Sequence, residues 1–286
     1  MRTPPRLQPL EDDGLIDETI SQLMSGKEAQ VYIVRCGDRL RCAKIYKEAN
    51  KRSFKQAAQY QEGRKVRNSR DVRAMGKRTR YGQRGQEEAW LNAEVEALRR
   101  LYQAGVRVPQ THGFVDGVLL MDMITDAEGD VAPRLNDVQM SAEDARRFHA
   151  SVMQDVVKML CAGLIHGDLS EFNVLMAANG PVIIDLPQAV NAAGNNNAAA
   201  MLMRDVENMT RYFGRFAPEL RDTFYGPEIW DLYQRGQLHP NVKLTGKFER
   251  RAENANIDEI MAVIAHARAE AEEAEQRRLA AENPDD

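Results

Sequence analysis

Residues 164–175, Leu-Ile-His-Gly-Asp-Leu-Ser-Glu-Phe-Asn-Val-Leu, constrain the fold of this chain most. A polar cluster between two short apolar runs predicts a strand, a loop and a second strand. A further apolar run follows a Gly-Pro turn and ends at Asp185. Transfer of a phosphoryl group from ATP needs a carboxylate that orients the attacking hydroxyl and oxygen ligands for divalent ions. Asp168 fits the first task, and Asn173 and Asp185 fit the second.

A structural alternative exists for the same stretch. Asp and Asn are common in turns, so a strand-turn-strand hairpin could place them there for backbone reasons alone. A bare hairpin does not need His-Gly-Asp ahead of an Asn at this spacing, which favours the chemical interpretation. Mg2+ binds a few carboxylate or amide oxygens together with phosphate and water, so two protein ligands are enough. The pattern does not distinguish Mg2+ from Mn2+.

The upstream part of a nucleotide site is also predicted. A turn over residues 25–28 enters an alternating strand, and a second strand carries Lys44. A lysine on such a strand contacts the phosphates in protein kinases. The turn contains one glycine, so it is a weak signal alone, and it lacks the Walker A pattern. The residues predicted to bind the nucleotide or its metal ion are Ser25, Gly26, Lys27, Glu28, Val31, Lys44, Met121, Met123, Ile124, Asn173 and Asp185.

The lysine needs a carboxylate partner on the following helix. Apolar residues at helical spacing predict this helix over residues 87–103. Glu94 is the predicted partner and the third catalytic candidate beside Asp168 and Lys44. The competing glutamates on this helix are Glu87, Glu88 and Glu96.

These segments resemble the RIO kinases, an atypical protein kinase family. The resemblance rests on residues 25–32, 44–47, 166–173 and 184–188. It implies an α+β, two-lobed kinase fold with a β-rich amino-terminal lobe and a mainly helical carboxyl-terminal lobe. It also implies ATP, a divalent metal, and phosphorylation of serine or hydrolysis of ATP. The wording of residues 166–173 is closer to the first branch of the family, in a bacterial-like form.

Two departures from ordinary protein kinases predict a reduced substrate platform. Gly167 stands where those enzymes carry the arginine of His-Arg-Asp, so no guanidinium is available there to hold a phosphorylated activation loop. Asp185 is followed by Leu-Pro-Gln, and a helix is expected to begin near Ala200. A full activation segment does not fit into so short a connection.

The chain is expected to divide as kinase lobes do. We expect a flexible terminus over residues 1–14, a helix over 15–24, a hinge at 122–124 that binds adenine, and a charged helix over 257–286. The amino-terminal lobe would span 15–121, with a basic flexible insertion at about 48–86, and the carboxyl-terminal lobe 125–256. Met121 would guard the back of the adenine pocket, although a plain core methionine fits the sequence equally well.

The basic insertion suggests a polyanionic partner. Residues 50–86 hold twelve basic and two acidic residues, although the whole chain has a net charge of −4. Such local charge attracts phosphate backbones or acidic proteins, and the RIO resemblance suggests RNA or a ribosomal particle. A solvated loop is the alternative. The sequence has no run of apolar residues long enough to span a membrane, and we expect a cytoplasmic protein.

Three functions are compatible with these residues. The first is an ATP-dependent serine protein kinase that also phosphorylates itself. The second is an ATPase switch of RIO type that binds RNA or ribosomal precursors and uses the same active-site residues. The third is a small-molecule phosphotransferase, since antibiotic and choline kinases also carry a His-Gly-Asp loop ending in Asn. The Ser-Glu-Phe-Asn wording argues against the third.

Overall fold

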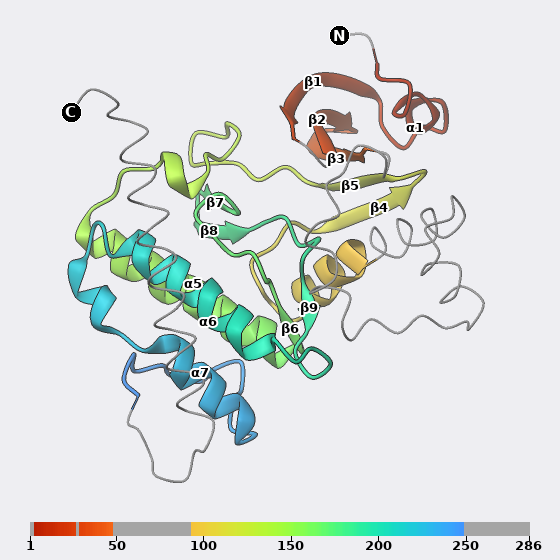
Figure 1. The fold of residues 1–286 in the computed structure, drawn as a ribbon. Helices are drawn as coiled ribbons and strands as arrows, with labels where there is room; N and C mark the ends of the chain where they lie inside the picture. Colours follow the sequence, from red (N-terminus) through yellow and green to blue (C-terminus); the bar gives the residue numbers. More distant parts are fainter. Residues whose placement is uncertain (1–2, 27–28, 48–92, 249–286) are drawn as a thin grey trace, which may run out of the picture. The chain divides into compact units, whose positions relative to one another are not determined.

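The computed structural model describes residues 3–26, 29–47 and 93–248 (Figure 1). The chain forms two compact units. The first unit comprises Met1–Ala132 and Ala177–Pro187, and the second comprises Pro133–Met176 and Gln188–Asp286. The first is built on a β-sheet and the second is mainly helical, so the predicted α+β class is confirmed.

The first unit contains a five-stranded antiparallel sheet with the strand order β1-β2-β3-β5-β4. Its strands are β1 (Glu18–Ser25), β2 (Ala29–Cys36), β3 (Arg39–Tyr46), β4 (Thr111–Val115) and β5 (Val118–Asp122). A two-residue turn at Asp116 and Gly117 joins β4 to β5, with φ angles of 48° and 74°. Tight hairpins favour positive φ at both central residues, and Asp-Gly supplies it.

The register of this sheet separates two faces. Lys44 on β3 lies opposite Val31 on β2 and Leu119 on β5, and such partners share one face. The next residue along β3, Ala43, lies opposite Tyr32 and belongs to the other face. One face therefore carries the candidate phosphate-binding lysine, and the other is available for an apolar core.

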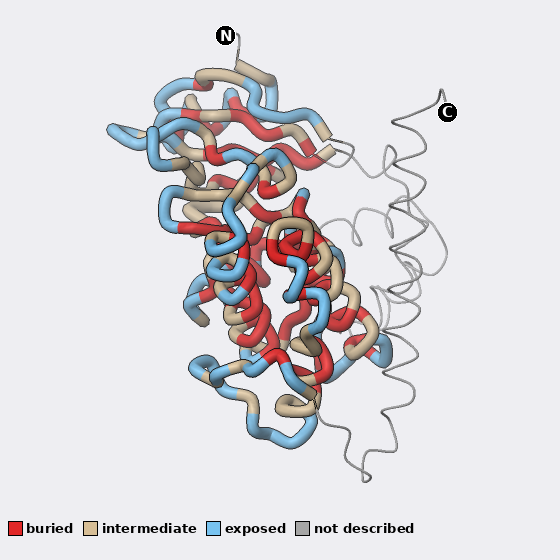
Figure 2. The backbone as a smooth tube through the Cα atoms, turned by 90° about the vertical axis from the view of Figure 1, so that its left-hand side faces the viewer, coloured by how far each residue is buried: buried red, intermediate tan, exposed pale blue. Residues whose placement is uncertain are grey.

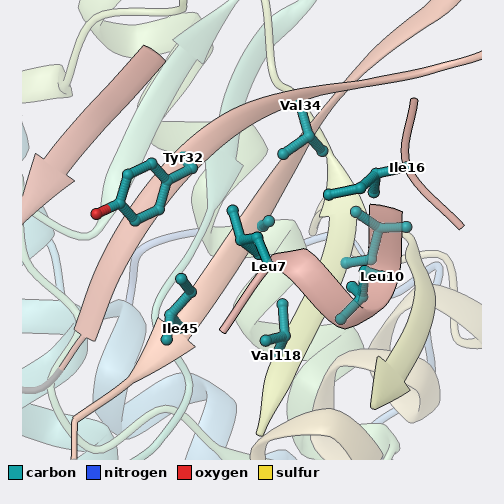
Figure 3. Packing of buried hydrophobic residues seen from close by; sticks show 9 residues of the cluster. Leu7, Leu10, Ile16, Tyr32, Val34, Ile45 and Val118 are labelled. Atoms are coloured by element: carbon teal, nitrogen blue, oxygen red, sulfur yellow. The ribbon is translucent and has the colours of Figure 1, made fainter. Parts of the chain in front are cut away.

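The core on that second face includes the amino-terminal segment, which the sequence predicted to be flexible. Leu7 and Leu10 are at most 2% exposed, and they pack with Val34 and Val118 of the sheet (Figure 3). Leu10 belongs to helix α1 (Gln8–Asp12). Burial of these two leucines explains why a Pro-rich, polar terminus is ordered here, since they cover apolar sheet surface that water would otherwise contact.

The helix predicted over residues 15–24 is wrong, because residues 18–25 form strand β1. This strand pairs with β2, and Thr19 donates a hydrogen bond to Glu11 at 3.0 Å. Pairing with a neighbouring strand supplies backbone hydrogen bonds that the local pattern does not reveal. By contrast, the helix predicted over 87–103 is helical throughout its described part, residues 93–103. In it, Val95, Leu98 and Leu101 are buried as expected.

The second unit is organised around two helices that lie side by side, α5 (Ala142–Cys161) and α6 (Ala198–Phe213) (Figure 1). The side chain of Ser141 caps α5 by accepting the Asp144 N–H at 3.1 Å, as the capping-box pattern predicts. Both helices turn apolar residues inward, and buried segments appear red in Figure 2. The other elements are η3 (Leu135–Asp137), β6 (Leu164–Ile165), β7 (Val174–Ala177), β9 (Val190–Asn191), η4 (Pro218–Asp222) and α7 (Tyr225–Gln234).

Strand β8 (Gly180–Ile183) belongs to the first unit, and it leads to Asp185. Within the described residues, no helix has both the length and the apolar character needed to cross a membrane. The basic insertion at 48–86 and the charged helix predicted at 257–286 lie outside the described residues. The predicted boundaries of lobes and hinge stay predictions.

Candidate active site

Lys44 is the centre of the charged network in the first unit. Its Nζ lies 2.7 Å from Glu94 Oε1 and 2.9 Å from Asp185 Oδ1. Strand β3 supplies the lysine, the helix over residues 93–103 supplies Glu94, and the segment after β8 supplies Asp185. Three residues from separate parts of the sequence therefore meet, and the pair of Lys44 and Glu94 is the one that the sequence predicted.

The network is buried on its lysine side. The side chains of Lys44 and Glu94 are 11% and 2% exposed, whereas that of Asp185 is 44% exposed. Burial lowers the pKa of Lys44, but the nearby Glu94 and Asp185 carboxylates outweigh it and raise this pKa well above its ordinary value. The ammonium group thus stays charged at any physiological pH, as a phosphate-binding group requires.

Asp185 has an unusual backbone. Its φ angle is 65°, in the left-handed region, which asparagine and aspartate tolerate better than most side chains. The residue before it ends an apolar run, and Leu186 after it is 1% exposed. The backbone is left-handed at Asp185 and the next residue is buried, whereas the Asp185 carboxylate itself is exposed.

The turn before β2 is held by a second lysine. Lys47 Nζ donates to the carbonyl of Gly26 at 2.5 Å, and the Gly26 N–H donates to the carbonyl of Ala29 at 2.9 Å. Ser25 at the end of β1 is exposed, and Val31 is buried. The described part of the predicted phosphate-covering turn is therefore tied to the end of β3. Lys27 and Glu28 lie outside the described residues.

Of the residues predicted to bind adenine, Met121 lies in β5, and Met123 and Ile124 come directly after this strand. Met121 lies opposite Cys42 in the register, so it shares the sheet face of Lys44. Met123 and Ile124 are half-buried, and the carbonyl of Ile124 accepts the N–H of Ala132 at 3.0 Å. Their part in binding adenine stays a prediction.

The loop between β6 and β7, in the second unit, carries Asp168 and Asn173. Asp168 is an exposed residue, and Asn173 Nδ2 donates to the Asp168 carbonyl at 2.8 Å. This bond orients the amide nitrogen toward the loop backbone, so the amide oxygen is the atom able to coordinate a cation. His166, 2% exposed, accepts the Asp168 N–H on Nδ1 at 3.3 Å. The histidine thus helps to orient the backbone at Asp168.

Helix α6 anchors this loop through Asp205, a residue that the sequence analysis did not single out. Its carboxylate accepts the N–H groups of Gly167 at 2.7 Å and Leu169 at 3.0 Å. Arg204 donates to the Gly167 carbonyl, and Asn208 Nδ2 donates to the Leu169 carbonyl at 3.0 Å. Helix α6 thus holds the N–H and the carbonyl of both residues that flank Asp168.

Asp205 is 1% exposed. Burial raises its pKa to about 6, although His166, the two backbone N–H groups and Arg204 oppose the shift. An aspartate in the middle of the apolar face of a helix was the available sequence signal. A buried carboxylate needs partners, and here they are the N–H groups of the catalytic loop.

Asn173 in the second unit and Asp185 in the first carry the two oxygen donors that the sequence predicts for a divalent ion. Asn173 offers an amide oxygen and Asp185 an exposed carboxylate, the oxygen donors that Mg2+ binds together with water and phosphate. Among the described residues there is no group of three His, Cys, Asp or Glu side chains that could hold a metal alone. Binding of a divalent ion by Asn173 and Asp185 stays a prediction.

Comparison with known proteins gives the family. The RIO domain family matches residues 30–224. The RIO-type serine/threonine-protein kinase Rio1 of Haloferax volcanii is 34% identical over 72% of this chain and 67% of its own length. Rio1 of Methanocaldococcus jannaschii is 31% identical over 70% of this chain and 64% of its own length. Rio2 of the same archaeon is 35% identical over 45% of this chain and 47% of its own length.

The chain thus spans about half to two thirds of the lengths of these relatives. Relatives named Rio1 and Rio2 both match, so the assignment to the first, bacterial-like branch stays a prediction. The match covers β2 to the end of η4, which includes Lys44, Glu94, Asp168, Asn173 and Asp185. This chain is a member of the RIO family of atypical serine/threonine protein kinases.

Proposed function

We propose that this protein transfers the γ-phosphoryl group of ATP to serine hydroxyls of proteins, including its own. The observation that carries the proposal is the contact of Lys44 with both Glu94 and Asp185, at 2.7 and 2.9 Å. A fixed, charged lysine beside an exposed metal-binding carboxylate matches the phosphate-binding half of a kinase site. The names of the relatives, serine/threonine-protein kinases, support the same activity.

Each residue then has a distinct task. Lys44 holds phosphate oxygens of the nucleotide, and Glu94 keeps the lysine in place. Asp168 orients the serine hydroxyl and accepts its proton as the new bond from serine oxygen to phosphorus forms and the bond to ADP breaks. A Mg2+ ion bound by Asn173 and Asp185 would neutralise charge on the phosphates. We propose Mg2+ as the metal, with Mn2+ as the alternative.

The loop geometry supports the task given to Asp168. The peptide groups on either side of it are fixed by Asp205, Arg204 and Asn208, while its own residue is exposed. A base held by its backbone with its side chain open to solvent can meet a protein hydroxyl at low reorganisation cost. A mobile loop would lose this advantage.

The test is a time course with γ-labelled ATP and Mg2+ that follows label on protein and as free phosphate. Wild type is compared with Asp168→Asn and Asp185→Asn. Label on protein serine that both variants lose supports the proposal. Free phosphate without protein label, also lost in the variants, contradicts protein kinase activity and supports an ATPase switch. Phosphate transfer to a small alcohol such as choline in preference to protein would favour the small-molecule phosphotransferase.

The ATPase switch is the second candidate, with RNA or a ribosomal particle as partner. It is favoured by the charge of residues 50–86, which hold twelve basic and two acidic residues. Neutralising Arg64, Lys65 and Arg67 should weaken binding to ribosomal RNA and flatten its salt dependence. Unchanged affinity and unchanged salt dependence would contradict this candidate. The cytoplasmic location stays a prediction.

A further inference from the structure

Glu94 has a second partner that neither the sequence analysis nor the kinase pattern supplied. Its Oε1 accepts from Lys44 Nζ at 2.7 Å, and its Oε2 accepts from the hydroxyl of Tyr46, also at 2.7 Å. Glu94 is 2% exposed. A carboxylate out of reach of water needs a donor on each oxygen, and the tyrosine is the donor on the second one.

The strand geometry explains why Tyr46 can reach Glu94. Tyr46 is two residues after Lys44 on β3, so both side chains lie on the same face of the sheet. Its ring is 2% exposed and stands edge-on to Phe114, with 6.4 Å between centroids. Lys44 Nζ lies 5.2 Å from the centre of the same ring, within the range of a cation–π contact.

The hydroxyl of Tyr46 is a permanent donor in this position. Burial raises its pKa above the ordinary value, and the negative charge of Glu94 raises it further, while Lys44 opposes the shift. The O–H therefore stays protonated over the whole working range of pH. It offers Glu94 a hydrogen bond without adding a charge that would compete with Lys44 for the carboxylate.

We propose that Tyr46 is a positioning residue for phosphoryl transfer, which fixes Glu94 so that Lys44 meets only one oxygen of that carboxylate. Lys44 then keeps N–H donors for Asp185 and for phosphate. Without the hydroxyl, Oε2 would be buried and, among the described residues, would have only the neighbouring ammonium group as a donor. Lys44 would be drawn toward it and away from the phosphate side. This inference rests on the proposed function, in which Lys44 holds the nucleotide.

The test variant is Tyr46→Phe, which removes one oxygen atom and keeps the ring in its packing. Tyr32→Phe is the matched control, because Tyr32 is also buried in this sheet, on β2, and its hydroxyl makes only a 3.4 Å bond to the neutral Gln22. The kinetic readouts are kcat and the KM for ATP, with melting temperature measured beside them. The binding readout is the Kd of the ATP–Mg2+ complex.

We expect Tyr46→Phe to lower kcat/KM for ATP by about tenfold or more, as loss of a hydrogen bond to a buried charge predicts. Both a higher KM and a lower kcat should contribute, because Lys44 holds phosphate before and during transfer. Tyr32→Phe should leave both constants unchanged. Wild-type kinetic constants in Tyr46→Phe would overturn the proposal, even if its melting temperature fell.

A double-mutant cycle with Glu94→Gln separates positioning from a general structural effect. If Tyr46 acts through Glu94, adding Tyr46→Phe to Glu94→Gln should cost less than about twofold in kcat/KM. An equal, additive loss in both backgrounds would overturn the proposal. If Tyr46→Phe alone fails to fold, the comparison of Glu94→Gln with the double variant still tests the proposal. In both of these variants residue 94 is neutral, so loss of the Tyr46 hydroxyl leaves no buried charge without its donor.

The ATP Kd keeps this inference separate from the proposed function. If the wild type labels no protein but binds or hydrolyses ATP, the proposed protein kinase activity fails. The positioning role of Tyr46 is then still judged by the ATP Kd, which should rise in Tyr46→Phe and not in Tyr32→Phe. If Tyr46→Phe left both the ATP Kd and the rate of ATP hydrolysis unchanged, the positioning role of Tyr46 would be overturned whatever the outcome for protein kinase activity.

Discussion

The carboxylate of Asp205 accepts the backbone N–H of Gly167 at 2.7 Å, and this bond links helix α6 to the loop that carries the proposed base. The same carboxylate accepts the N–H of Leu169, so Asp168 lies between two anchored peptides. An ionised, buried aspartate is unfavourable in itself. Its retention on the apolar face of α6 is explained by the loop that it orders.

Asp205→Asn should change the pH dependence of stability. Burial raises the pKa of Asp205 to about 6 from 3.8 in the folded state. A raised acid pKa contributes stability that is fully present below the unfolded value and is lost as pH rises through the folded value. The variant lacks this loss, so relative to wild type it should gain up to about 3 kcal/mol between pH 4 and pH 7. Urea unfolding at several pH values measures the difference.

The same variant should lose activity at neutral pH, because the asparagine side chain has an N–H group where one loop N–H needs an acceptor. At neutral pH the variant should therefore combine its gain in relative stability with a loss of activity. A variant whose stability relative to wild type did not vary with pH would contradict the assignment of Asp205 as a group that titrates near pH 6.

Asp168→Asn should retain the fold and ATP binding and lose most transfer. The substitution keeps the size of the side chain and removes the proton acceptor, which contributes about 10²- to 10⁴-fold in general base catalysis. Asp168 is exposed, so the substitution places no new polar group in the core. Single-turnover rates and the ATP Kd check the two halves of the prediction. Full activity in the variant would exclude Asp168 as the base.

Lys44→Met should destabilise the protein, and Glu94→Gln should restore part of the loss. Removing the ammonium group leaves Glu94, 2% exposed, with the Tyr46 hydroxyl as its donor among the described residues and with an uncompensated charge. Breaking a buried ion pair in this way costs about 3 kcal/mol or more. The double variant neutralises the second partner and should recover stability but no activity. Thermal unfolding of both variants with activity assays checks this, and recovery of activity would contradict the task of Lys44.

Asp185→Asn and Asp185→Ala should differ in stability and agree in activity. The φ of 65° at this position suits asparagine and strains alanine, so the alanine variant should be about 1 kcal/mol less stable. Both lose the carboxylate and should lose metal-dependent transfer. Chemical unfolding gives the comparison, and equal stabilities would show that the left-handed backbone relaxes on substitution.

The sequence predicted the residues of the site better than their supports. Lys44, Asp168 and Asp185 were recognisable because catalysis restricts their type and spacing along the chain. Glu94 could be chosen among four glutamates only as a hypothesis, and the structure brings it to Lys44. Tyr46 and Asp205 were missed, because their tasks depend on which residues fold against them and not on a linear pattern.

In the fold as well, elements with a clear local pattern were predicted, and elements that depend on distant partners were missed. The helix over residues 93–103 follows from the spacing of its apolar residues and is found where expected. Strand β1 was predicted as a helix, because its partner β2 decides its conformation. The segment before it was predicted to be flexible, although Leu7 and Leu10 are buried. Two apolar residues among many polar ones give little local signal and matter only once a sheet face exists to receive them.

The packing of α1 on the sheet determines how far this protein can be truncated at its amino terminus. The family match begins at residue 30, after both α1 and β1. An expression fragment cut at that point would lose the partner strand of β2 and uncover Val34 and Val118, which are at most 1% exposed in the whole chain. Such a fragment would have an open sheet edge and an apolar face, the two features that drive aggregation. The shortest fragment that resists aggregation should therefore begin before Leu7.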